Sequence, residues 1–150
     1  MVTRIRRSLD DGERGFTLIE LLVVMTIIGV LAAIAIPLFL SQRRRAEDTA
    51  SQADVSVIGK EVATGFVDNS AAPVVNEVGR VYYFAAAPST AASDRIGNQS
   101  ANVVLGVSVI HDAADWCVAV HDESGDASKA NGTTGGYKYS ATGGLEQGTC

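Results

Sequence analysis

The feature that most constrains this chain is an apolar run from Phe16 to Leu40, in which Glu20 is the only ionisable side chain. As a helix the run would be about 37 Å long, since each residue adds about 1.5 Å. That length crosses a hydrocarbon layer of about 30 Å with some tilt. The run therefore predicts a membrane-spanning helix, and it leaves one small domain to fold in water.

The helical pattern continues beyond the apolar run. No proline lies between Leu40 and Pro73, and apolar side chains recur there at steps of three and four residues. This spacing predicts a helix to about Asp68 with one apolar stripe. The stripe consists of Val55, Ile58, Val62 and Phe66. Within the membrane segment, Pro37 removes a backbone hydrogen bond and is expected to bend the helix, and Gly29 is a second soft point.

After Pro73 the pattern changes to an alternation with period two. Four segments rich in β-branched and aromatic residues predict strands, and the turn residues between them favour an antiparallel sheet. These segments are 80–85, 103–110, 116–120 and 137–140. The predicted class is α+β, with a long N-terminal helix packed through its stripe on a roughly four-stranded antiparallel sheet. Residues 122–136 are expected to form a long exposed loop.

Charge is distributed unevenly along the chain. Residues 46–150 carry five basic side chains and thirteen acidic ones. Because such a surface repels phosphate, nucleic-acid binding by this region as a whole is disfavoured. Four arginines precede Phe16, and three more, residues 43–45, follow the apolar run. Basic residues normally stay on the cytoplasmic side of a membrane, so this near balance gives little support to either topology.

Residues 14–40 carry a specific motif. A short charged leader ends in Gly15, Phe16 follows, and Glu20 is the fifth residue counted from Phe16. This segment closely resembles the class III signal peptide of type IV pilins and pseudopilins. The resemblance implies that a prepilin peptidase removes the leader, residues 1–15, by cutting after Gly15, and then methylates the new amine of Phe16.

The resemblance also implies an organisation and a function. Residues 16–40 would be the membrane and filament-core helix, 41–68 its amphipathic continuation, and 69–150 a β-rich head. Subunits would leave the cytoplasmic membrane through an assembly platform with its ATPase and stack as a helical surface filament for adhesion or twitching motility. A major pilin, a minor pilin, and a pseudopilin of a type II secretion or competence system remain alternatives.

Glu20 also has a physical interpretation. A charged side chain in the middle of a membrane helix costs about 2.5–3.5 kcal/mol, so the carboxylate is expected to have a partner. In the family this partner is the free amine of Phe16, in a neighbouring subunit or the same one. Pairing the two charges in an apolar filament core would set the axial register, because an unpaired carboxylate there is strongly penalised.

Two other interpretations of the apolar run are weaker. Residues 33–35, Ala-Ile-Ala, resemble an ordinary signal-peptidase site that would release a secreted ligand-binding module beginning near Ile36. The apolar residues before this site are too many, and they continue past it. A simple single-span anchor requires neither the Gly15 junction nor Glu20. If the head is exported, Cys117 and Cys150 are expected to form a disulfide.

Other candidate chemistry is limited. His111 and His121 lie among aspartates, but their spacing fits no tight metal-ligand motif. The segment Asp122–Asp126 lacks the ordered ligand pattern of a dedicated calcium loop, although calcium binding there stays open. No serine, cysteine or histidine arrangement indicates a nucleophile. The sequence therefore predicts no enzyme activity and no cofactor.

Overall fold

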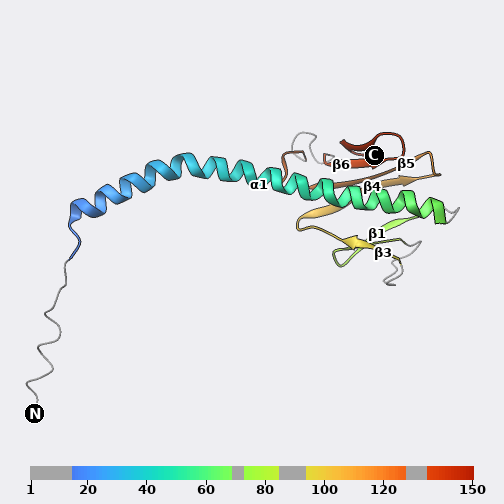
Figure 1. Ribbon diagram of the computed structural model, residues 1–150, viewed down its shortest axis with the longest axis horizontal. Helices are drawn as coiled ribbons and strands as arrows, with labels where there is room; N and C mark the ends of the chain where they lie inside the picture. Colours follow the sequence, from blue (N-terminus) through green and yellow to red (C-terminus); the bar gives the residue numbers. More distant parts are fainter. Residues whose placement is uncertain (1–14, 69–72, 85–93, 128–134) are drawn as a thin grey trace, which may run out of the picture. The chain divides into compact units, whose positions relative to one another are not determined.

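The computed structural model describes residues 15–68, 73–84, 94–127 and 135–150. The chain divides into two compact units, with the division between Phe39 and Leu40. One helix, α1 (Leu18–Asp68), belongs to both units and contains Pro37 (Figure 1). The helix was predicted to end at about Asp68, and the described part of α1 reaches that residue. The helix begins at Leu18, two residues after Phe16.

In the first unit, α1 is apolar on all sides. Its most apolar window has a mean hydropathy of 2.8 and none of it is buried. By length and composition, α1 is the one helix among the described residues that could cross a membrane.

The second unit contains two antiparallel sheets. The first has three strands in the order β1-β2-β3, and the second has four in the order β4-β5-β6-β7. The strands of the first are β1 (Val75–Val78), β2 (Val81–Phe84) and β3 (Arg95–Asn98). Those of the second are β4 (Val103–Ile110), β5 (Trp116–Asp122), β6 (Tyr137–Ser140) and β7 (Gly144–Gln147). A hydrogen bond from Leu105 N–H to Glu77 Oε2, 3.0 Å long, joins β4 to β1.

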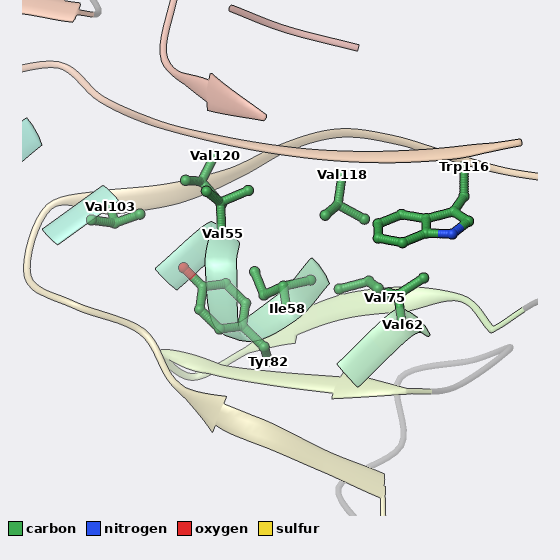
Figure 2. Close-up of a cluster of buried hydrophobic side chains, with 9 residues drawn as sticks. All are labelled: Val55, Ile58, Val62, Val75, Tyr82, Val103, Trp116, Val118 and Val120. Carbon is green, nitrogen blue, oxygen red and sulfur yellow. The ribbon is translucent and has the colours of Figure 1, made fainter. Parts of the chain in front are cut away.

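The core lies between α1 and the two sheets. The predicted stripe residues Val55, Ile58 and Val62 have no exposed surface, and Phe66 packs against them. Figure 2 shows side chains of both sheets meeting this stripe. They are Val75, Tyr82, Val103, Trp116, Val118 and Val120. The predicted α+β class, a long helix packed on antiparallel sheet, is therefore confirmed.

The strand arrangement differs in detail from the prediction. All four predicted strands are present, as β2, β4, β5 and β6, but β2 belongs to the three-stranded sheet. The strands β1, β3 and β7 were not predicted, because each has four residues and no clear alternation. The predicted loop 122–136 is wrong at its start, since Asp122 ends β5 and is buried. Part of that segment, 128–134, lies outside the described residues.

A disulfide joins Cys117 of β5 to Cys150, 33 positions later. In β5, Cys117 alternates with Trp116 and Val118, whose side chains are buried in the core. The disulfide therefore lies on the opposite face of the sheet and ties the C-terminal segment to it. A second tie is the hydrogen bond from Gly148 N–H to Gly136 O, 2.9 Å long.

Reduction of this disulfide is expected to destabilise the head by about 2–4 kcal/mol, because the unfolded chain regains the freedom that the closed loop removes. Urea unfolding followed by tryptophan fluorescence, with and without reductant, measures the change. A Cys117→Ala, Cys150→Ala double variant should match the reduced protein and be insensitive to reductant. An unchanged urea midpoint would contradict the expectation.

Candidate functional site

Thr17 and Glu20 together cap the start of α1. The Glu20 N–H donates to Thr17 Oγ1 over 3.2 Å, and Glu20 Oε2 accepts from the Thr17 N–H over 3.1 Å and from its hydroxyl over 3.0 Å. This reciprocal pattern is a capping box, which satisfies backbone donors that a helix start leaves without partners. It explains why the helix begins at Leu18. The Glu20 carboxylate is thus held within the first turn, close to Phe16.

The role of Thr17 was not predicted, although the Thr-x-x-Glu spacing before an apolar run is a recognised signal of this cap. Gly15 and Phe16 precede the helix, and the Phe16 side chain is 88% exposed. Gly29 lies within α1, and a Cβ added there would meet nothing within 4 Å. Pro37 is accommodated inside the helix, and a bend there stays a prediction.

The side chains between Phe16 and Leu40 form an apolar surface on all sides of the helix. Each large apolar residue of this segment is exposed, from 44% at Leu40 to 89% at Leu18. A contiguous apolar surface of this extent marks a contact with a membrane or with other protein chains. This part of α1 therefore requires lipid or other subunits around it.

Two of the three arginines that follow the apolar run have acidic partners in the second unit. Arg43 Nε lies 3.5 Å from Glu47 Oε1, and Arg44 Nη1 lies 3.7 Å from Asp126 Oδ1. The Arg44–Asp126 pair is exposed on both sides, and in the other pair Arg43 is exposed whereas the Glu47 side chain is only 15% exposed. An exposed pair contributes about 0–1 kcal/mol to stability. These arginines are therefore available to other acidic or phosphate groups at small energetic cost.

Two acidic side chains, Asp122 and Asp48, hold the backbone of the turn that follows β5. Asp122 Oδ1 accepts the Ser124 N–H over 2.7 Å. Asp48 of α1 accepts the N–H groups of Asp126 and Ala127, at 3.2 Å and 3.1 Å. Within the part of the chain that the structure describes, no three histidine, cysteine, aspartate or glutamate side chains gather as metal ligands, His111 and His121 included.

Asp122 introduces a pH dependence. Burial, with a further contribution from the Glu47 carboxylate, raises the pKa of Asp122 above its usual value of 3.8. The folded state therefore binds this proton more tightly than the unfolded state does. Its stabilising contribution is complete below the unfolded pKa and is lost as the pH rises through the folded pKa.

Asp122→Asn is therefore expected to stabilise the head at pH 7 and to have little effect at pH 3, because asparagine keeps the acceptor for Ser124 and carries no charge. A gain of 1 kcal/mol would raise Tm by about 4–8 °C in a domain of this size. Thermal unfolding from pH 3 to 7 measures it. Glu123→Gln, the same charge change at an exposed neighbour, is the control. Parallel Tm curves for the Asp122→Asn and wild-type proteins would contradict the assignment.

An exposed apolar helix with a capped glutamate near its start, followed by a head in which the helix packs on two sheets, is typical of a membrane-anchored protein. The family described as a prokaryotic N-terminal methylation motif matches residues 11–36. This match includes the Gly15–Phe16 junction and Glu20. The chain thus carries the methylation motif and is similar, over part of its length, to type IV pilins and pseudopilins.

Several curated relatives match part of the chain. The type II secretion system core protein G of Escherichia coli (strain K12) is 33% identical over 67 residues, 45% of this chain and 46% of the relative. The type IV wide pilus major component PilA4 of Thermus thermophilus is 58% identical over 38 residues, 25% and 29% of the two chains. The type IV major pilin protein PilA of Myxococcus xanthus is 43% identical over 49 residues, 33% and 22%.

The matched region therefore covers less than half of each of these relatives. No solved structure matches the chain significantly. The likeness to the curated relatives thus covers only part of each chain.

Proposed function

We propose that the chain is a prepilin that becomes a structural subunit of a type IV pilus-like surface filament acting in adhesion or motility. In this proposal the prepilin peptidase cuts after Gly15 and methylates Phe16. The observation that carries the proposal is the fully exposed apolar part of α1, which begins at a matched methylation motif. Such a helix is stable only in lipid or among copies of itself.

The capping box is relevant to the transfer of the helix from the membrane to the filament. Cleavage creates a positively charged amine at Phe16, next to Thr17, whose N–H and hydroxyl already contact Glu20. The new amine and the carboxylate then lie near the same helix start, where either can pair with its counterpart in a neighbouring subunit. Pairing removes the cost of an isolated charge in the apolar filament core. The proposed partners are the prepilin peptidase, the assembly platform with its ATPase, and further copies of the chain.

The mature N-terminus tests this proposal directly. Intact-mass and N-terminal peptide analysis of sheared surface fibres is expected to show a chain that starts at methylated Phe16. A chain that still carries Met1–Gly15 would contradict processing. A soluble protein beginning near Ile36 would favour the secreted module instead.

A pseudopilin of a type II secretion system is the second candidate. Its support is the match to core protein G over 67 residues, although the type IV major alpha-pilin of Moraxella bovis matches over the same length. Deletion of the chain distinguishes the roles. The pseudopilin would be favoured if the deletion strain loses protein export and wild-type cells yield few sheared fibres. Abundant fibres and unchanged export would favour the major pilin, and loss of DNA uptake would indicate a competence role.

A further inference from the structure

A polar hollow of about 320 Å³ lies in the second unit, where α1 leaves the apolar run. Its volume is at the lower end of the range of small-ligand sites, about 300–1,000 Å³. It is lined by Leu40, Arg43, Arg44, Glu47, Glu123 and Ser124. Two guanidinium groups and two carboxylates thus face one space, with an apolar residue at one end.

The order of these groups along α1 follows the order of groups in a phospholipid. Leu40 comes first, Arg43 is about 4.5 Å further along the helix axis, and Glu47 is about 6 Å beyond that, at about 1.5 Å per residue. A phospholipid that carries an amine presents its acyl chains, its phosphate and its ammonium group in the same sequence. We propose that this hollow binds the headgroup of an amine-bearing zwitterionic phospholipid, of the phosphatidylethanolamine class. The proposal rests on the membrane-anchored state in the proposed function.

The arginines can hold the phosphate. Their ion pairs with Glu47 and Asp126, at 3.5 Å and 3.7 Å, are longer than normal N–H···O hydrogen bonds of about 2.7–3.2 Å. A guanidinium group has five N–H donors in a planar fork that matches phosphate oxygens. Arg43 and Arg44 therefore keep N–H groups for a phosphate without giving up their acidic neighbours.

The carboxylates select for the amine. Glu47 and Glu123 balance the two arginines within the hollow, and Asp126 lies just beyond, so a ligand with net negative charge gains little. A primary ammonium group offers three N–H donors to carboxylates, whereas the trimethylated group of phosphatidylcholine offers none. Charge complementarity thus favours phosphatidylethanolamine over phosphatidylglycerol and phosphatidylcholine.

Native mass spectrometry of the detergent-solubilised full chain, titrated with each lipid, tests the proposal. Phosphatidylethanolamine is expected to bind about tenfold more tightly than phosphatidylcholine, the equivalent of about 1.4 kcal/mol or one charge-assisted hydrogen bond. Glu123→Gln should abolish this preference. Arg44→Gln should weaken the binding of both lipids about tenfold. Arg45→Gln makes the same charge change on the neighbouring residue, which does not line the hollow, and should have no effect.

Equal dissociation constants for the three lipids would overturn the proposal, as would an Arg45→Gln effect as large as that of Arg44→Gln. If the wild-type protein shows no lipid preference and Glu123→Gln changes the oligomeric state, the hollow would be a contact with a second copy of the chain. Glycerophosphoethanolamine, which lacks acyl chains, should bind more weakly than the lipid, and equal binding would contradict a membrane ligand. Flotation of the chain with vesicles separates the proposed lipid site from the proposed membrane anchor. If the chain fails to float, the membrane anchor itself is contradicted.

Discussion

Glu20→Ala is expected to abolish filament assembly while leaving the head folded. The substitution removes the only carboxylate of the apolar segment and leaves the amine of Phe16 without its proposed partner in the filament core. A comparable unpaired charge costs about 2.5–3.5 kcal/mol in an apolar layer, which corresponds to a loss of about 100-fold in the assembly equilibrium. Immunoblotting of sheared surface fibres against total cell protein measures this loss.

Two matched variants separate the roles of Glu20. Glu20→Gln keeps an oxygen that can accept from Thr17 but carries no charge, so it should lose assembly nearly as fully. Thr17→Ala keeps the charge and loses the cap, which costs about 1 kcal/mol of helix stability, so fibres should persist at reduced yield. Wild-type amounts of fibre from Glu20→Ala would refute the pairing. If Thr17→Ala, which keeps Glu20, also lost most of its fibres, the effect would be due to the cap and not to the charge.

Asp54→Ala is expected to cause the largest loss of head stability, about 3–5 kcal/mol. Asp54 lies in α1 with 6% of its surface exposed. It accepts the Tyr82 hydroxyl over 3.0 Å, the Ser100 N–H over 2.8 Å and the Ser100 hydroxyl over 2.7 Å. One carboxylate therefore joins the helix to β2 and to the segment that precedes β4. Its removal leaves several buried donors without an acceptor.

Urea unfolding of the full chain in detergent, followed by Trp116 fluorescence, measures this effect. Burial, reinforced by Asp54, raises the pKa of Tyr82, so its hydroxyl keeps the proton that it donates. Tyr82→Phe removes one hydrogen bond to a charged group and should cost about 1.5–3 kcal/mol. Glu61→Ala, which removes an exposed carboxylate of the same helix, serves as the surface control. An Asp54→Ala protein within 1 kcal/mol of wild type would show that the network contributes little.

The helix was largely predictable because its signals are local. The apolar run needs no tertiary partner to be recognised, and the spacing of Val55, Ile58 and Val62 indicates the buried stripe directly. The four strands with β-branched and aromatic residues were predictable for the same reason. The short strands β1 and β3 were not, because their residues follow no alternation and become strands only by pairing with β2.

Other features depended on contacts between distant residues. From the sequence, Gly59 is a residue that disfavours helix. In the structure, a Cβ at this position would lie about 2.5 Å from the ring of Tyr139. The glycine thus allows β6 to approach α1 closely. Asp122 was expected in an exposed loop but is buried at the end of β5, where it interacts with Ser124 and Glu47. Neither result follows from the residues next to each position.

The amino-acid sequence alone determined the long apolar helix, its methylation motif and the α+β class, because hydrophobic periodicity and motif spacing act over a few neighbouring residues. Only the tertiary structure decided the division into two sheets, the Asp54 network and the hollow beside Arg43 and Arg44. These features arise where segments dozens of residues apart meet, and their energies depend on burial and on distances that a linear pattern does not contain.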